Sequence, residues 1–390
     1  MKIVIVASLA FSLVNFRRRL IADMVACGHQ VLACAPDDDP DVAGQLAAMG
    51  VSYRVMPMQR VGLNPVADLR TLWWIVALLD RERPDLVLAY TQKPIVYSGI
   101  ACRIVRRVRF FAMVSGLGHA FGNEGSRWLR LLVARLYRSA LARAEAIFVF
   151  NADDRPEMLR HRMISPAAPV VQVPGSGVDL SHYRAAPIPP GPLRFLMIAR
   201  LLRSKGLFEF VEAARNVRAR HPDVRFELLG PLDPSPAGIG EEQLQAWKRE
   251  GVVDYLGEAR DVRPYLAAAS VFVLPSWYRE GLPRTILEAM ATGRAVVTTD
   301  MPGCREPISE GVNGYLVAPR DAGALEATLL RFVDDPSLVS EMGARGREIA
   351  EAHYSAEHVT DMLLSTMHLR DAGTGHPSSP VGTYLAGATP

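Results

Sequence analysis

Cysteine is scarce in this chain of 390 residues, and no C-x-x-C spacing occurs among Cys27, Cys34, Cys102 and Cys304. Neither a zinc site nor a disulfide framework is therefore indicated, and we interpret the four thiols as reduced structural residues. Long apolar runs are missing too, since the longest fall well below the roughly 20 residues that a membrane-spanning helix needs. The opening stretch 1–7 is too short for a secretory signal and predicts a buried strand. The sequence thus predicts a cytoplasmic protein.

Two motifs that would indicate a bound cofactor or metal are also missing. No G-x-G-x-x-G follows the first expected strand, Lys2–Ala7, which disfavours a dinucleotide-dependent oxidoreductase. No D-x-D motif stands at a convincing strand end, and the acidic run Asp37–Asp41 is interpreted as a solvated turn. Aromatic residues are not interleaved with basic ones as a stacking platform, which argues against nucleic acid as a partner. We therefore expect no metal, no cofactor and no nucleic acid.

Alternating strand and helix patterns fill most of the chain and predict an α/β fold with doubly wound parallel sheets. In the first half we expect strands at 2–7, 29–35, 52–56, 86–89, 110–114 and 146–150, and helices at 16–26, 42–49, 66–81 and 127–141. In the second half we expect strands at 193–199, 225–229, 252–256, 271–274, 295–299 and 314–317, with a helix at 208–220 and another near residue 288.

The length of the chain predicts two domains, and the proline-rich stretch 185–192 fits a linker between them. We predict a Rossmann-like domain over 1–185, a second over 186–354, and a last helix at about 355–369 that returns to the first domain. The tail 373–390 is rich in Gly, Pro, Ser and Thr, so we expect it to be disordered. Ligands of such sheets bind beyond the carboxyl ends of the strands, which places the expected site in a cleft between the domains.

Charge is distributed unevenly between the two halves. Residues 1–185 carry 23 Lys and Arg against 15 Asp and Glu, whereas the remainder is acidic. Basic residues recur on the expected helix 127–141, where they interleave with Trp and Leu in an amphipathic pattern. That pattern is compatible with an anionic membrane surface, and the plain alternative is a helix made soluble by arginine. Only the first half is expected to meet an anionic partner.

Residues 276–300, SWYREGLPRTILEAMATGRAVVTTD, place two carboxylates, Glu280 and Glu288, around the start of an expected helix. Glu280 would stand in the loop before the first turn, and Glu288 inside the helix. The two carboxylates are eight positions apart, with a turn of helix between them. This spacing suits a long polyhydroxylated ligand better than a metal ion or an acid/base pair acting on one atom. The plain alternative is a pair of solvated glutamates on a surface helix.

The start of this helix predicts a site for an anion. Pro283 suits a first helical turn and Gly293 suits the position after the last, which predicts a helix over about 283–292. The N–H groups of Gly281 and Leu282 would then lie free at the positive end of the helix dipole. Such a helix start favours a phosphate or another anion.

The stretch resembles the E-x7-E signature of retaining glycosyltransferases of family 4, which have the GT-B fold. Its wording, YREGLPRTILEAMATGRAVVTTDMPGCRE, looks like the subgroup that builds lipid-linked saccharides for bacterial polysaccharide or glycan assembly. The resemblance implies that Glu280 takes hydroxyls of the donor sugar and that Glu288 holds the ribose of the nucleotide. It also implies the GT-B architecture, with two Rossmann-like domains facing each other across a cleft.

Further segments resemble donor-binding parts of the same family. Arg200 and Lys205, spaced R-x4-K-G, resemble its diphosphate clamp, with ordinary surface charges as the alternative. Val253 lies in a segment that matches the one taking the nucleobase through backbone groups, and Gly177 lies in a loop that resembles N-G-V-D. The predicted catalytic set is Glu280, Arg200 and Lys205, and the predicted donor-binding set is Glu288, Gly281, Leu282, Pro283, Val253 and Gly177.

The first domain is expected to bind the acceptor, and here the chain departs from the family. Ser12–Phe16 replaces the Gly-Gly loop of many members, although this bulkier loop, with Asn15, could still shape the acceptor site. Ser115 occupies the slot where many relatives carry His, and His119 follows four residues later as a sugar contact or a satisfied loop histidine. Lys93 stands at another expected strand end and is a further candidate.

The resemblance implies a retaining, metal-independent transferase of a hexose or N-acetylhexosamine. The donor would be a nucleotide sugar, first of all a UDP-sugar, and the acceptor a polyprenyl-diphosphate-linked saccharide. The acceptor hydroxyl would attack on the face that the nucleotide leaves, and the leaving phosphate would help take the proton. Such an enzyme would be peripheral on the inner face of the plasma membrane. The alternatives are a GT-B sugar-nucleotide epimerase, a transferase with a soluble acceptor, and a nucleotide-sugar-binding protein without turnover.

Overall fold

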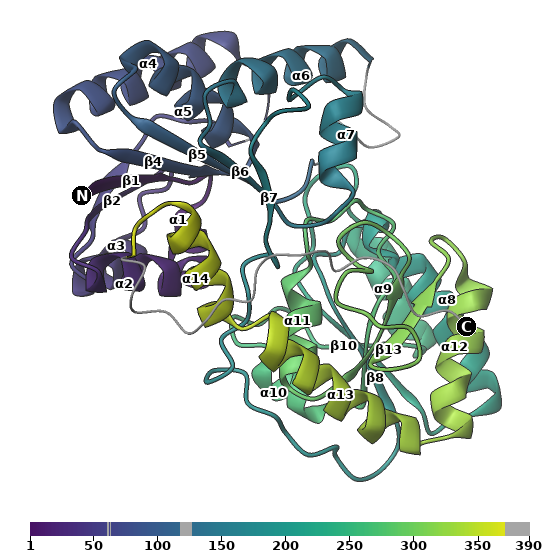
Figure 1. The fold of residues 1–390 in the computed structure, drawn as a ribbon. Coiled ribbons are helices and arrows are strands. Elements are labelled where there is room, and N and C mark those ends of the chain that lie inside the picture. The colour runs from purple at the N-terminus through teal and green to yellow at the C-terminus, as the bar shows by residue number, and fades with distance from the viewer. Residues whose placement is uncertain (61, 63, 118–126, 371–390) are drawn as a thin grey trace.

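Two parallel β-sheets, each covered by helices on both faces, make up the computed structural model of this chain (Figure 1). The structure describes residues 1–60, 62, 64–117 and 127–370. The predicted α/β class with two Rossmann-like, doubly wound sheets is confirmed. None of the described helices is long and apolar enough to cross a bilayer.

The first sheet has seven parallel strands in the order β3-β2-β1-β4-β5-β6-β7. Its strands are β1 (Lys2–Val6), β2 (Gln30–Ala35), β3 (Ser52–Val55), β4 (Leu86–Tyr90), β5 (Arg109–Val114), β6 (Ala146–Val149) and β7 (Val170–Gln172). Its helices are α1 (Ala10–Phe16), α2 (Arg18–Ala26), α3 (Pro40–Ala48), α4 (Pro65–Glu82), α5 (Gln92–Val105), α6 (Arg127–Leu141) and α7 (Asp154–Arg160). Alternate strand residues face two separate cores: Val4 packs toward α4, α5 and α6, and Ile5 toward α1, α2 and α3.

The second sheet has six parallel strands in the order β10-β9-β8-β11-β12-β13. They are β8 (Arg194–Ile198), β9 (Arg225–Leu229), β10 (Asp254–Tyr255), β11 (Val271–Leu274), β12 (Ala295–Thr299) and β13 (Gly314–Val317). The helical elements are η2 (Arg203–Lys205), α8 (Leu207–Arg220), α9 (Glu241–Glu250), α10 (Arg263–Ala268), α11 (Arg284–Ala291), α12 (Ala322–Asp334) and α13 (Ser337–His353). Strand order reverses between β8 and β11, as it does between β1 and β4 in the first sheet, and such switch points are where ligands of these sheets bind.

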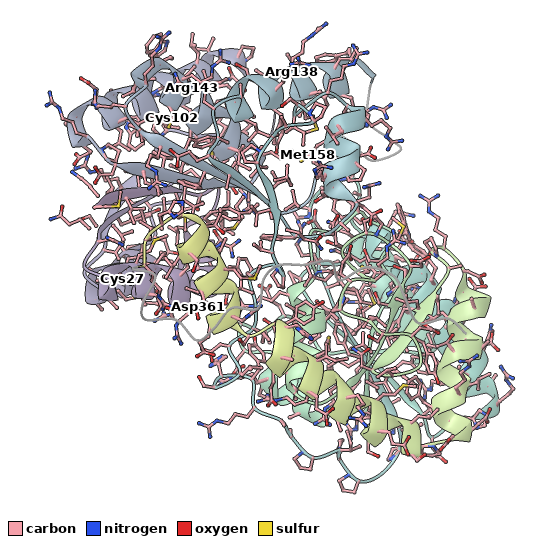
Figure 2. The ribbon with its side chains drawn as sticks, in the orientation of Figure 1. Cys27, Cys102, Arg138, Arg143, Met158 and Asp361 are labelled. Carbon is pink, nitrogen blue, oxygen red and sulfur yellow. The ribbon has the colours of Figure 1, made fainter. Side chains whose placement is uncertain are left out.

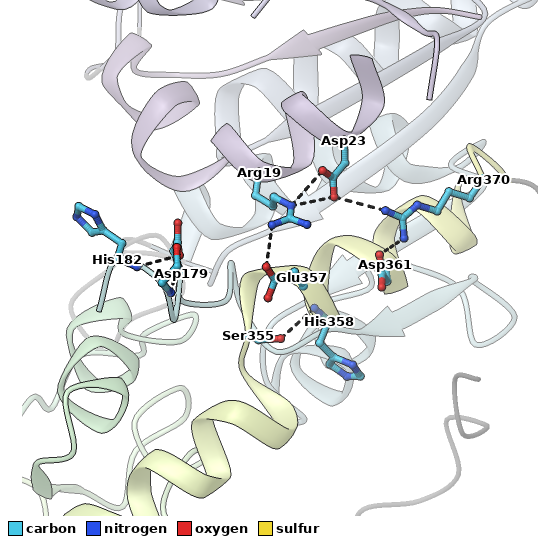
Figure 3. Close-up of polar contacts among 10 residues, drawn as sticks. Arg19, Asp23, Asp179, His182, Ser355, Glu357, His358, Asp361 and Arg370 are labelled. Atoms are coloured by element: carbon cyan, nitrogen blue, oxygen red, sulfur yellow. Dashed lines mark hydrogen bonds and ion pairs between the residues drawn. The ribbon is translucent and has the colours of Figure 1, made fainter. Parts of the chain in front are cut away.

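The last described helix, α14 (Ala356–Thr366), leaves the second domain and packs on α2 of the first (Figure 1). Its buried face, with Val359, Leu363 and Leu364, joins the core below α1, α2 and α3. Ion pairs surround this contact, among them that of Arg19 Nη1 with Glu357 Oε1, which lie 2.8 Å apart and are drawn in Figure 3. Because exposed ion pairs contribute little, we attribute the attachment of α14 chiefly to its apolar face.

Two local expectations are wrong. The segment expected as a loop at 12–16 belongs to helix α1, since Leu13 and Val14 are buried and no glycine interrupts them. The acidic run after β2 is more than a solvated turn: Asp37 accepts a hydrogen bond from the N–H of Ala10 at 2.6 Å, and Asp39 caps α3. Both carboxylates satisfy N–H groups at helix starts, which otherwise lack partners.

Candidate active site

The loops after β8 and β11 meet at the switch point of the second sheet. Gly206, which follows η2, has a φ of 81°, and a side chain at this position would collide with the carbonyl group of Pro275. Glycine therefore permits the close approach of the two loops. The N–H of Trp277 donates to the carbonyl oxygen of Ser204 at 3.0 Å and ties one loop to the other.

Lys205 and Glu280 form an ion pair between these loops. Ser276 Oγ donates a hydrogen bond to the same carboxylate oxygen, Glu280 Oε1, at 2.9 Å. The side chains of Lys205 and Glu280 are 17% and 12% exposed, so solvent screens their attraction only weakly. Lys205 Nζ also lies 5.8 Å from the ring centre of Tyr278. The tertiary structure thus places a cation and a carboxylate together at the edge where ligands of such sheets bind.

Arg200 takes a different partner from Lys205. Its Nη1 lies 2.9 Å from Asp233 Oδ2, and its side chain is 60% exposed. Arg203, the other arginine of this loop, lies over the ring of Phe208 at 5.2 Å. An exposed ion pair costs little to break, so Arg200 can turn toward a phosphate group, and its assignment to the diphosphate stays a prediction.

Glu288 is buried and already engaged by two side chains. Arg284 Nε lies 2.8 Å from Glu288 Oε1, one helical turn away, and Tyr183 shares a hydrogen bond with the same carboxyl group. Burial raises the pKa of Glu288, and Arg284 opposes this rise. A carboxylate has about four lone-pair sites, so two partners leave Glu288 able to accept a ribose hydroxyl as well, and that role stays a prediction. The i, i+4 spacing could have indicated Arg284 from sequence, whereas no local signal indicated Tyr183.

Helix α11 runs from Arg284 to Ala291 and is therefore one residue shorter at each end than expected. Pro283 therefore occupies the N-cap position instead of the first turn. Within the described part of the chain, no residue accepts a hydrogen bond from the N–H of Gly281 or Leu282. These two N–H groups precede the helix start, and their contact with an anion stays a prediction.

Three strand ends of the first domain enclose the loop after β11. A Cβ atom on Gly116, after β5, would lie 2.9 Å from the nitrogen of Gly281, and one on Gly175, after β7, would lie 3.2 Å from Leu282 Cβ. Asn151, after β6, donates from Nδ2 to the carbonyl oxygens of Glu280 and Gly281 at 3.2 and 3.1 Å. Sequence reasoning missed Asn151, although its place directly after an expected strand was a signal.

The candidate acceptor residues fall into three groups. Ser115 packs through its carbonyl group against the loop after β11, and the carbonyl oxygen of Asn15 accepts a hydrogen bond from α11. Lys93 is engaged elsewhere, with Asp68 Oδ1 at 2.9 Å. His119 lies outside the described residues. Ser115 and Asn15 are therefore the candidates that the structure places beside the Glu280 loop and α11.

Two predicted donor contacts have structural partners of their own. Val253 is buried beside β10. Gly177 has a φ of 67°, and a Cβ atom there would lie 2.8 Å from Ala356 Cα, so its conformation is required at the start of α14. Across the described residues, no group of three or more His, Cys, Asp or Glu side chains is arranged to hold a metal ion. Metal independence itself stays a prediction.

A buried carboxyl group, Asp154, and a half-buried one, Glu306, influence each other electrostatically across the domain interface beside this site. Burial raises the pKa of Asp154, on α7 of the first domain, to about 7, and Arg279 opposes the rise. Burial likewise raises the pKa of Glu306, in the second domain, to about 7. The charged and titratable groups around the pair are Asp153, Arg279, Arg305, Tyr137 and Tyr354. Both carboxyl groups thus favour the protonated form in the folded protein.

This pair predicts a loss of stability as pH rises. Because both folded pKa values exceed the ordinary values of 3.8 and 4.5, the folded protein binds more protons than the unfolded chain between about pH 4 and pH 7. The denaturation midpoint in urea should therefore fall from pH 5 to pH 8, and Glu306→Gln should flatten that fall. Glu341→Gln, at an exposed position, is the control. An unchanged pH dependence in Glu306→Gln would contradict the prediction.

Comparison with known proteins follows the two-domain division. A model described as "Glycosyl transferase 4-like domain" matches residues 14–176, and one described as "Glycosyl transferases group 1" matches residues 192–335. The chain is 27% identical to an N,N'-diacetylbacillosaminyl-diphospho-undecaprenol α-1,3-N-acetylgalactosaminyltransferase of Campylobacter jejuni, over 84% of this chain and 88% of that protein.

Two further similarities agree with this one. The chain is 25% identical to the UDP-Gal:α-D-GlcNAc-diphosphoundecaprenol α-1,3-galactosyltransferase of Escherichia coli, over 71% of this chain and 73% of that protein. Its fold is similar to that of Anabaena HepE, crystallised in complex with UDP, with a TM-score of 0.76 at 18% identity. That superposition covers 94% of this chain and 100% of HepE.

Proposed function

Because this chain belongs to the group 1 glycosyl transferases with a 4-like first domain and the GT-B fold, we propose that it moves a sugar from a nucleotide sugar to a polyprenyl-diphosphate-linked saccharide. We expect a UDP-sugar that carries a hexose or N-acetylhexosamine, and a role in bacterial polysaccharide or glycan assembly. The names of the Campylobacter and Escherichia relatives, which both contain diphospho-undecaprenol sugars, support this acceptor. The UDP complex of HepE supports the nucleotide.

The observation that carries the proposal is the meeting of Lys205 and Glu280 at the switch point. Cleavage of a sugar–diphosphate bond leaves negative charge on the departing phosphate while the sugar becomes cationic. A lysine and the free N–H groups before α11 can stabilise the first charge, and a neighbouring carboxylate can hold hydroxyls of the sugar. The ion pair of Lys205 and Glu280 would thus supply the cation for the phosphate and the carboxylate for the sugar.

Retention of the anomeric configuration and independence of metal ions are further parts of the proposal. We propose that the acceptor hydroxyl attacks on the face that the nucleotide leaves and that the leaving phosphate helps take the proton. In this mechanism no carboxylate acts as a nucleophile, so Glu280 has a binding and electrostatic role. The anomeric configuration of the product, determined by NMR, tests the first statement, and activity in EDTA tests the second.

One experiment separates this function from its alternatives. Purified protein is incubated with a panel of nucleotide sugars and short polyprenyl-diphosphate saccharides, with and without EDTA. Transfer to the lipid in EDTA supports the proposal. Transfer to a soluble sugar indicates a soluble-acceptor transferase, interconversion of nucleotide sugars indicates an epimerase, and binding without any reaction indicates a nucleotide-sugar-binding protein.

The outer helices of the first domain support a peripheral membrane location for the same reaction. Helix α5 packs between α4 and α6, and these helices expose Val66, Leu69, Trp73, Ile104, Trp128, Leu131 and Leu132. Between α5 and α6 lies a groove of about 470 Å³ lined by Arg103, Arg106 and Arg143. Figure 2 shows Arg138 and Arg143 on this face, which is turned away from the second domain. Apolar side chains beside arginines suit an anionic bilayer.

Substitution on this face should weaken membrane binding. The double variant Leu131→Glu with Leu132→Glu is expected to bind vesicles of phosphatidylglycerol and phosphatidylethanolamine about tenfold or more weakly, since each buried leucine contributes about 1.5–3 kcal/mol. Co-sedimentation measures the effect. Val312→Glu, at an exposed apolar position of the second domain, is the control. Equal binding by the double variant and the parent would contradict the membrane assignment.

A further inference from the structure

Asn151 is a fully buried polar residue at the boundary between the two domains. Its Oδ1 accepts a hydrogen bond from the N–H of Asp154 at 2.9 Å, which fixes the orientation of the side-chain amide. The amide nitrogen has three acceptors: the carbonyl oxygens of Glu280 and Gly281, and Asp154 Oδ2 at 3.1 Å. The amide group can therefore take only this orientation.

The two carbonyl groups have no room to move away from Asn151. A Cβ atom on Gly303 would lie 2.6 Å from the carbonyl oxygen of Glu280, so the second domain closely backs this peptide. On the other side, Gly281 touches the carbonyl group of Ser115 in the first domain. Among the described residues, Asn151 is the first-domain side chain that donates hydrogen bonds to the loop after β11.

The ion pairs on either side of Asn151 are poorer in direction. Arg305 Nη2 lies 3.4 Å from Asp153 Oδ2, and both side chains are more than a third exposed. Arg279 Nη1 lies 4.0 Å from Glu157 Oε2, at the limit of an ion pair. Such contacts attract the domains toward each other but leave their register loose. The two N–H groups of the Asn151 amide are shared among three acceptors at 3.1 to 3.2 Å, within the ordinary range for hydrogen bonds, and these directional contacts can set that register.

We propose that Asn151 is a positioning residue, which holds the peptide after Glu280 to the first domain and thereby fixes the Glu280 carboxylate against Lys205. The inference rests on the proposed transferase function, because it states that the contact of Asn151 with the loop of the second domain affects the rate of sugar transfer. Nucleotide binding by the second domain does not need this contact. The chemical step does, because a small displacement of a positioned group is costly to rate.

Asn151→Ala is expected to lower kcat by about 10- to 100-fold, while the Kd for UDP, measured by calorimetry, stays within about twofold of the parent value. Asn216→Ala is the matched control, because Asn216 donates the same kind of bond to Glu326 on the surface of the second domain. Asn151→Asp removes the donor with little change of shape. Its kcat relative to the parent should recover in part as pH falls, since a protonated carboxyl group again donates.

A second measurement does not depend on turnover. Hydrogen exchange of a peptide that contains Trp277 and Glu280, whose N–H groups donate to the carbonyl oxygens of Ser204 and Pro302, should become faster in Asn151→Ala than in the parent and unchanged in Asn216→Ala. If the parent transfers no sugar, the proposed function fails, and faster exchange in Asn151→Ala still supports the conclusion that Asn151 holds the loop after β11. The inference is overturned if exchange is unchanged, or if kcat per folded molecule in Asn151→Ala stays within twofold of the parent. A loss of kcat matched by an equal loss of UDP affinity overturns it as well.

Discussion

Glu280→Ala is expected to reduce kcat by about 10²-fold or more, the scale of losing a positioned electrostatic contact. In the structure, the carboxylate of Glu280 is held by Lys205 and by Ser276 Oγ, and it follows the strand that borders the switch point. If Glu280 binds hydroxyls of the transferred sugar most strongly as the bond to the diphosphate breaks, its loss lowers kcat and kcat/KM together. Glu280→Gln should retain part of the rate, because the amide oxygen still accepts hydrogen bonds.

Initial rates with a nucleotide sugar and a polyprenyl-diphosphate saccharide measure this loss. Glu348→Gln removes one partner of an exposed ion pair, with Arg345, and is the control for removing a carboxylate. Thermal unfolding must accompany the kinetics, because the removal of Glu280 leaves Lys205 without its partner in a half-buried place. Near-parent rates in both Glu280 variants would exclude Glu280 from the reaction.

Lys205→Ala should also cut kcat by about 10²-fold or more, with a rise in the KM of the nucleotide sugar. Its ammonium group is the cation nearest to Glu280, and we expect it to meet the diphosphate in both the ground state and the transition state. Such a group contributes to binding as well as to rate, which separates its kinetic signature from that of Glu280. Lys248→Ala, on the exposed face of α9, is the matched control.

The two variants together test whether the ion pair acts as a unit. Residues in direct contact are rarely additive, so the double variant should lose less than the product of the two single losses. Full additivity would indicate that Lys205 and Glu280 act on separate parts of the donor. A parent-like KM and kcat in Lys205→Ala would contradict its assignment to the diphosphate.

The predicted fold class follows from patterns that are local in the chain. In the sequence, buried parallel strands are recognised as short apolar runs, and the helices between them by the helical periodicity of their apolar residues. The segment at 10–16 shows the limit of this reasoning. The absence of a glycine pair predicts a bulkier loop, but burial of Leu13 and Val14 and a hydrogen bond from the first helical N–H to Asp37 make it a helix. The accepting carboxylate belongs to a residue that is distant in sequence, so no local pattern shows it.

Candidate residues divide in the same way. The sequence indicates Glu280 and Glu288 by their spacing around a helix start, and Lys205 by its place after a strand together with the resemblance of R-x4-K-G to the family's diphosphate clamp. The partners that hold them were not all found. Asn151 reaches Glu280 across 129 positions of sequence, and Tyr183 reaches Glu288 from a loop outside its helix. Single residues of this kind have no pattern until the chain is folded.

By itself, the sequence determined the alternation of strands and helices, the two parallel sheets and the residue types at their carboxyl ends, because each depends on periodicity and on neighbours within a few positions. Only the tertiary structure decided that Lys205 pairs with Glu280, that Tyr183 reaches Glu288, and that Asn151 holds the loop between the domains. Each of these contacts joins residues that are far apart in the chain, and the contact of Asn151 also depends on how the two domains pack, so no local periodicity or spacing predicts them.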